Sequence, residues 1–166
     1  MVPPAAVQYG PLVPVILVKG DLLNTPGFHA FAHSVDASGA MATGIAVAFK
    51  KRWPAMFEDF QKRAQERKPQ MGDTVVWTDG TDTIYSLVVQ AAPDKAGTTA
   101  ALDRAVEGMI TAASSAGIEQ IAVSRLGAGK AALDWTRVKR VLEERADARP
   151  VTLQVYEQFV RSERKA

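Results

Sequence analysis

The segment Leu126-Gly-Ala-Gly-Lys-Ala-Ala-Leu-Asp-Trp135 joins an apolar run to an amphipathic one. The apolar run 121–123 predicts a strand, and apolar residues at helical spacing from Trp135 to Leu142 predict a helix with Asp134 as its N-cap. Gly127 and Gly129 have no side chain, so the backbone can take positive φ and bring its amides close to an anion. The positive end of the helix dipole adds to that attraction. This order of elements predicts an anion-binding turn in an α/β fold.

Two well-known phosphate motifs fit this turn poorly. It matches the loose dinucleotide pattern G-x-G-x-x-A, but that pattern opens its fold, whereas here only one further strand, 151–156, follows. Lys130 follows the second glycine too soon for a P-loop, and Ala131 stands where a Ser or Thr would bind magnesium. Nucleoside triphosphatase chemistry is therefore not expected. A plain glycine turn between strand and helix is the alternative to an anion site.

The rest of the chain alternates strands and helices. The continuous apolar run 15–18 predicts a strand buried on both faces, and further strands are expected at 28–35, 118–124 and 151–156. Residues 74–77 and 83–89 flank Asp79-Gly80, which predicts an antiparallel hairpin. These patterns predict a mixed sheet of about six strands.

Helices are expected between these strands. One covers 44–49, and a second begins near Pro54 and presents Met56, Phe57, Phe60 and Ala64 on one face. A third, strongly periodic helix runs from Leu102 to Ala113 and ends at Gly117 as its C-cap. Helices and sheet together predict a single three-layer α/β/α sandwich.

Length and composition limit the protein class. At 166 residues, with 47% hydrophobic and 23% charged residues, the chain suits one domain, which we assign to 13–160 between a proline-rich arm at 1–12 and a basic tail at 161–166. No run reaches the roughly 18 apolar residues of a membrane span, and the first residues lack a signal-peptide pattern. A cytoplasmic protein with no membrane partner is expected. The absence of cysteine excludes disulfides, thiolate chemistry and Cys-ligated metal sites.

The net charge of +2 is too small to predict nucleic-acid binding by itself. Basic residues do cluster at 50–52, at 62–68 and in the tail after Arg161. No aromatic residues interleave with them as a stacking platform would require. They are solvated helix faces or, alternatively, a nucleic-acid groove.

Three segments directly follow predicted strands, where α/β sheets bind ligands. They are Gly20-Asp21-Leu22, the glycine-bearing loop 36–44 and the loop that starts at Leu126. Two phosphate-competent loops facing one crevice suit a diphosphate, and the Asp21 carboxylate could accept hydrogen bonds from an adenine amino group or a ribose hydroxyl. A nucleoside diphosphate-sugar is the expected ligand.

Four segments of the chain resemble macrodomains: 18–23 (VKGDLL), 32–36 (AHSVD), 41–54 (MATGIAVAFKKRWP) and 126–135. The similarity covers about 15–156 in the same order. It is closest to the branch that contains the terminal ADP-ribose protein glycohydrolases and the antitoxin macrodomains that remove ADP-ribose from DNA.

The resemblance implies a crevice for ADP-ribose or an ADP-ribosylated macromolecule. Asp21 and the backbone of Leu22 would contact adenine, with Tyr156 flanking the ring or, alternatively, serving as an edge-of-core tyrosine. The remaining expected contacts form two loops: Asp36, Ser38, Met41, Ala42, Thr43, Gly44 and Ile45 at the distal ribose and pyrophosphate, and Leu126, Gly127, Ala128, Gly129 and Lys130 around the phosphates.

Two catalytic positions of that branch depart from its pattern. Its members place a lysine that attacks the anomeric carbon at the end of the strand matching 83–89, and Gln90 stands there in this chain. An amide cannot be that nucleophile. Some relatives also use an aspartate in the second glycine loop, and the matching residue is Ala131. The lysine-dependent hydrolase mechanism is therefore expected to be lost.

Few residues offer another route. Asp36 could orient or deprotonate water at the anomeric carbon, or it could cap nearby amides as a loop carboxylate. Lys130 could act as an electrophile or phosphate ligand, or face solvent. His29 and His33 would lie roughly 13 Å apart on a strand. We expect no metal site and no cofactor.

Three hypotheses follow for function. The first is an ADP-ribose-binding module, and the second is a hydrolase that removes ADP-ribose from protein or nucleic acid by Asp36-assisted attack of water. The third is a nucleic-acid-associated protein whose basic helices carry the modified strand to the crevice. Whether the chain is an enzyme stays open at this point.

Overall fold

The computed structural model describes residues 14–66 and 69–160. The arm at 1–12 and the tail at 161–166 lie outside the described residues. In the described part, no helix is both long enough and apolar enough to cross a membrane.

Six strands and four helices make up the fold of residues 14–66 and 69–160. The strands are β1 (Val15–Gly20), β2 (Ala30–Asp36), β3 (Thr74–Thr78), β4 (Thr83–Gln90), β5 (Gln120–Val123) and β6 (Thr152–Phe159). The helices are α2 (Ile45–Arg52), α3 (Pro54–Glu66), α4 (Thr99–Ser115) and α5 (Trp135–Ala146). Two short 3₁₀ turns, η1 (Leu22–Asn24) and η2 (Gly129–Ala131), follow β1 and β5.

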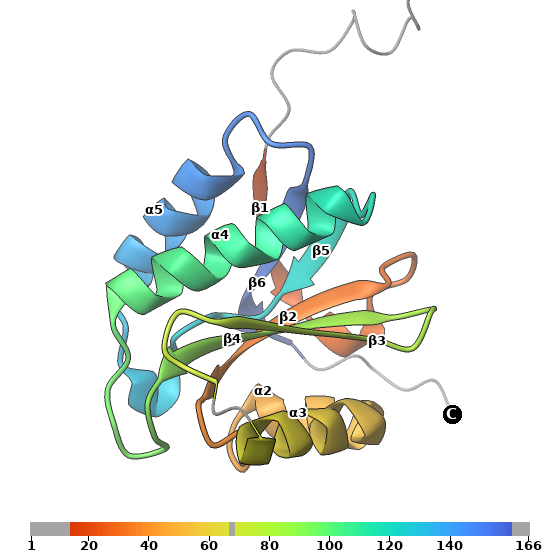
Figure 1. Cartoon of the computed structure of the whole chain (residues 1–166). Helices are drawn as coiled ribbons and strands as arrows, with labels where there is room; N and C mark the ends of the chain where they lie inside the picture. Colours follow the sequence, from red (N-terminus) through yellow and green to blue (C-terminus); the bar gives the residue numbers. More distant parts are fainter. Residues whose placement is uncertain (1–13, 67–68, 161–166) are drawn as a thin grey trace, which may run out of the picture.

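The strands form one mixed sheet in the order β1-β6-β5-β2-β4-β3. All neighbouring pairs are parallel except β3 with β4. Helices α2 and α3 cover one face of the sheet, and α4 and α5 cover the other (Figure 1). Each face has its own core, one built around Leu102, Met109 and Leu142 and the other around Phe49 and Phe60. The expected three-layer α/β/α sandwich with about six strands is confirmed.

Local sequence signals explain several element boundaries. Gly117 takes φ +74° just past the end of α4, and the Ile118 amide donates to the Ala113 carbonyl at 2.9 Å, which closes the last turn. The Asp79 carboxylate accepts from the amides of Thr81 and Asp82 in the β3–β4 turn. The hairpin is therefore as predicted, whereas the C-cap of α4 is Ala116, one residue before the expected Gly117.

The first strand differs from its expectation. The run 15–18 was expected to be buried on both faces, but Ile16 and Leu17 are each 41% exposed. The reason is position, because β1 lies at the edge of the sheet and pairs only with β6. The second strand also begins later than expected, at Ala30 instead of Phe28.

The topology positions the site. Since β1, β2, β4, β5 and β6 all run parallel, their carboxyl ends meet at one edge of the sheet. The segments after β1, β2 and β5 are the three that the sequence singled out, so all three lie at this edge.

Candidate functional site

Two adjoining cavities lie at the carboxyl edge of the sheet. The first, here called the base cavity, measures about 240 Å³, and the second, here called the loop cavity, measures about 320 Å³. Ile45, Arg125 and Ala128 line both of them. A single elongated ligand could therefore occupy both cavities.

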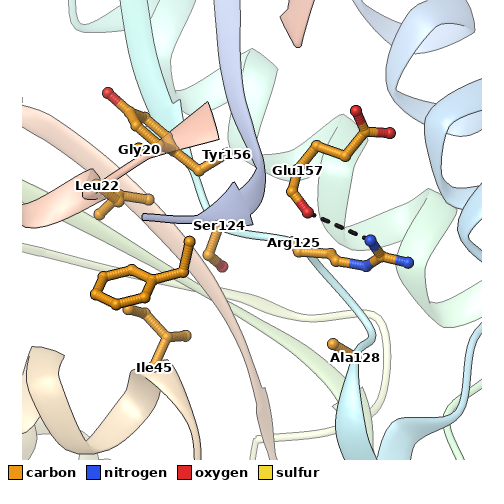
Figure 2. Close-up of a pocket in the computed structure, with 9 residues that line it drawn as sticks. Gly20, Leu22, Ile45, Ser124, Arg125, Ala128, Tyr156 and Glu157 are labelled. Atoms are coloured by element: carbon orange, nitrogen blue, oxygen red, sulfur yellow. Dashed lines mark hydrogen bonds between the residues drawn. The ribbon is translucent and has the colours of Figure 1, made fainter. Parts of the chain in front are cut away.

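The base cavity is mostly apolar. Leu22, Ile45 and Tyr156 form part of its wall (Figure 2). Leu22 is 2% exposed, and Phe159 also lines this cavity. The Tyr156 hydroxyl is hydrogen-bonded to the Thr25 hydroxyl and accepts from the side-chain Nε2 of Gln154 at 3.0 Å, so the ring is held in place. A fixed aromatic ring beside aliphatic side chains suits a flat heterocycle.

Asp21 is not among the residues that line this cavity, although its chain neighbours Gly20 and Leu22 are. Its Oδ1 accepts from the Leu23 amide at 3.1 Å and caps the turn η1. The structure therefore brings Leu22 and Tyr156 together at one cavity, while the contact of Asp21 with a base stays a prediction.

The loop cavity is lined by both glycine-bearing loops. Asp36, Ala42, Thr43 and Gly44 come from the loop after β2, and Gly129 and Lys130 come from the loop after β5. Lys130 is exposed. The expected meeting of the two loops is found. Ala42, Gly44 and Gly129 are among the residues of this wall, and backbone amides next to such small residues suit phosphate oxygens.

Two expected contacts of the first loop shape the loop and do not line the cavity. The amide and the hydroxyl of Ser38 both donate to Asp36 Oδ1, the amide at 2.8 Å. Met41 takes φ +48° and packs its side chain into the core below, where it is 3% exposed. Gly44 takes φ +62° and ψ −147°, a conformation reserved for glycine, at the N-cap of α2.

The second loop is fixed by its own contacts. The Gly127 amide donates to Ser34 Oγ at 3.0 Å, and the Leu133 amide donates to the Gly127 carbonyl at 3.0 Å. Leu126 is buried in the core at 1% exposure, so its side chain anchors the loop. Asp134 occupies the N-cap of α5 as expected, but its side chain makes no capping hydrogen bond.

Gln90 ends β4 and lines the loop cavity beside Asp36, its partner in the sheet. Its carbonyl accepts from the Ala37 amide at 2.9 Å, and its Nε2 donates to the Lys95 carbonyl at 2.8 Å. The side-chain amide therefore ties the loop after β4 to the crevice. A neutral, hydrogen-bonded amide offers no nucleophile.

Sequence reasoning missed Arg125, Glu157 and Phe159, which also line the base cavity. Arg125 directly follows β5, so the rule that pointed to the other segments after strands would also have found it. Phe159 was missed because β6 is longer than the expected strand 151–156.

The two histidines lie apart. His33 is buried beneath Phe49 in a ring stack of 4.2 Å, and its Nε2 is 2.7 Å from Ser86 Oγ. Burial lowers the pKa of His33 to about 3, so the ring is neutral. His29 precedes β2 and contacts Asp82 at 3.2 Å. Within 14–66 and 69–160, no group of His, Cys, Asp and Glu has a metal-binding arrangement.

Three of the described basic residues of α2 and α3 make contacts within the protein. Arg52 donates to the Leu23 carbonyl at 2.8 Å, and Arg63 pairs with Asp59 at 2.8 Å. Lys50 lies over the Phe57 ring. Arg67, Lys68 and the tail lie outside the described residues. This cluster is at least partly engaged in local structure.

Comparisons with known proteins agree with this geometry. The sequence profile of the family described as Macro domain matches residues 32–142. The ADP-ribose glycohydrolase OARD1 of Homo sapiens is 29% identical over 142 residues, covering 86% of this chain and 90% of that protein. The DNA ADP-ribosyl glycohydrolase of Mycobacterium tuberculosis is 30% identical over 131 residues, covering 75% of this chain and 36% of that protein.

Solved structures give the same result for the fold. The macrodomain of Mycobacterium tuberculosis DarG superimposes with a TM-score of 0.80 and 25% identity, covering 92% of this chain and all of that one. The macrodomain of Thermus aquaticus DarG superimposes with a TM-score of 0.79 and 24% identity, covering 86% of this chain and 97% of that one.

Proposed function

The chain belongs to the Macro domain family, and from that premise we propose that its crevice binds ADP-ribose, free or attached to a macromolecule. One observation carries the proposal: an apolar, aromatic-walled cavity adjoins a second cavity lined by two glycine-bearing loops. A base, a diphosphate and a second ribose fit that succession. The names of the relatives, which are ADP-ribose and DNA ADP-ribosyl glycohydrolases, support the same ligand.

Binding without hydrolysis is the part of the proposal that rests on Gln90 and Ala131. The resemblance places a nucleophilic lysine at the first position and an aspartate at the second. In this chain the Gln90 amide is bonded to the Lys95 carbonyl, and Ala131 is 2% exposed within η2. Neither side chain can attack the anomeric carbon or remove a proton from water. The chain would therefore recognise ADP-ribose without using that mechanism.

Calorimetric titration with ADP-ribose tests the proposal, with AMP and NAD as controls for the distal ribose and its substituent. Micromolar binding selective for ADP-ribose is expected. An Asp21→Asn variant keeps the oxygen that caps Leu23, but it turns an NH₂ donor toward the purine amino group. We expect its affinity to fall about tenfold, since hydrogen bonds to charged groups contribute roughly 1.5–3 kcal/mol.

The matched control for Asp21→Asn is Asp59→Asn, which removes the same charge on α3, where Asp59 pairs with Arg63. It should bind ADP-ribose like the unaltered chain. Failure of the unaltered chain to bind ADP-ribose would overturn the proposed function. Equal binding by Asp21→Asn would remove only the role given to Asp21.

A second candidate function is hydrolysis through Asp36, favoured by the position of Asp36 beside Gln90 in the loop cavity. Asp36 Oδ1 is already bonded to the amide and the hydroxyl of Ser38, which supports the capping alternative. We therefore expect no measurable release of ADP-ribose from modified DNA or protein. Release that disappears in Asp36→Ala, measured by chromatography of the free nucleotide, would reverse this conclusion.

The attachment of the ADP-ribose to a macromolecule, either protein or nucleic acid, stays a prediction. Protein and nucleic acid are both candidates, and the basic faces of α2 and α3 make nucleic acid possible. The cytoplasmic location expected from the sequence also stays a prediction, which cell fractionation would test.

A further inference from the structure

Arg125 occupies the junction of the two cavities. It directly follows β5 and lines both the base cavity and the loop cavity, as do Ile45 and Ala128. A ligand that extends from one cavity into the other would therefore pass these three residues. Of the three shared residues, only Arg125 carries a charge.

The guanidinium is held in place by two neighbours. Its centre lies 4.7 Å from the centroid of the Trp135 ring, and Nη1 donates to the Glu157 main-chain carbonyl at 3.3 Å (Figure 2). Trp135 begins α5 and Glu157 lies on β6, so two separate elements fix the position. An arginine held this way loses less side-chain entropy when it binds a ligand.

The neighbouring carboxylate is engaged elsewhere. Glu157 Oε1 accepts from Trp135 Nε1 at 2.8 Å and lies 3.6 Å from Lys139 Nζ. The Trp135 hydrogen bond, with Lys139 and Arg125 nearby, holds the pKa of the Glu157 carboxyl below its usual range. Among the described residues, no carboxylate oxygen lies within 4.0 Å of the Arg125 guanidinium. Its positive charge thus has no close ion pair among the described residues, and the residue is exposed at the point where it lines both cavities.

From this geometry we propose that Arg125 binds the diphosphate of the ligand and makes the crevice selective for nucleotides with two phosphates. The inference rests on the proposed function and adds a residue and a specificity to it. The planar guanidinium presents several N–H donors that match phosphate oxygens two at a time. The glycine loops supply neutral amides, so the positive charge comes from Arg125 and, in the loop cavity, from Lys130 as well.

Calorimetric titrations of the whole chain with ADP-ribose, ADP, AMP and adenosine test the inference. For Arg125→Ala, affinity for ADP-ribose and ADP should fall about 10- to 30-fold, while affinity for adenosine should change less than about twofold. Arg125→Lys keeps the charge but not the paired donors, so it should recover only part of the loss. Raising the salt concentration should weaken diphosphate binding less in Arg125→Ala than in the unaltered chain.

Lys139→Ala is the matched control, because it removes one positive charge beside the same Glu157 without lining either cavity. It should bind all four ligands like the unaltered chain. Equal loss for Lys139→Ala and Arg125→Ala, equal loss for adenosine and ADP-ribose, or no loss in Arg125→Ala would each overturn the role of Arg125. If the unaltered chain does not bind ADP-ribose, the proposed function fails and this inference fails with it.

Discussion

Replacing Gly39 with alanine is expected to destabilise the fold by about 3 kcal/mol or more and to weaken ADP-ribose binding. A Cβ at this position would lie 2.1 and 2.3 Å from Cδ1 and Cε1 of Phe60, inside the contact distance of any two carbons. Phe60 is 1% exposed in the core beneath α3, so its ring cannot move aside freely. Gly39 also takes φ +66°, which strains any other residue.

The structural consequence reaches the crevice. The Gly39 amide donates to the Asp36 carbonyl at 3.1 Å, and its own carbonyl accepts from Gln61 at 2.6 Å. Pushing this point away from Phe60 would displace the loop whose residues 42–44 line the loop cavity. Weaker binding should therefore accompany the lower stability.

Gly117→Ala provides the control for backbone strain alone. Gly117 takes a similar φ of +74°, but a Cβ there would meet nothing within 4 Å. The free energy of unfolding of this variant should be lower by about 1 kcal/mol, and the variant should bind ADP-ribose like the unaltered chain. Urea denaturation of both variants gives the comparison. Equal loss of stability in the two would show that contact with Phe60 contributes nothing.

Acid should destabilise the protein strongly through His33. The pKa of this ring is about 3 in the folded state, because burial disfavours its charged form, and is near 6.5 when unfolded. Between these two values the unfolded chain binds a proton that the folded chain does not. Stability is then complete above pH 6.5 and falls by up to about 1.4 kcal/mol per pH unit below it.

His33→Gln isolates this contribution, since a glutamine does not titrate and can still hydrogen-bond Ser86. Carboxylates such as Asp103, whose pKa the Arg145 hydrogen bond lowers, add the same acid dependence to both proteins. Urea denaturation from pH 7 to pH 4.5 should therefore show a shallower loss of stability in the variant. Parallel losses, or an NMR titration of His33 near pH 6.5 in the folded protein, would contradict the assignment.

Local signals predicted most of the elements. Asp79-Gly80 marked the hairpin, Gly117 marked the end of α4, and the apolar spacing of Met56 and Phe60 gave the buried face of α3. These signals involve residues near one another in sequence. Propensity, turn conformation and periodicity are all properties of short segments, so they can be read without the fold.

The site was predicted in part, through a rule on parallel sheets. The segments that follow β1, β2 and β5 were found because parallel strands bring their carboxyl ends to one edge. The sequence raised the capping of loop amides by Asp36 as an alternative, and the Ser38 amide does donate to Asp36. The burial of Met41 in the core was not foreseen, because its φ of +48° is set by the folded loop.

By itself, the sequence determined the order and type of the elements, the three-layer architecture and the meeting of two glycine-bearing loops at one edge of the sheet. Only the tertiary structure decided that β1 is an edge strand with Ile16 and Leu17 exposed, that the Gln90 amide holds the loop after β4, and that Arg125 stands between two cavities. The physical reason is that each of these depends on contacts between distant segments. An apolar run is compatible with a strand at the centre or at the edge of a sheet, until the strand order fixes its position. An arginine that follows a strand can face solvent or a crevice, until the packing of the helices fixes its surroundings.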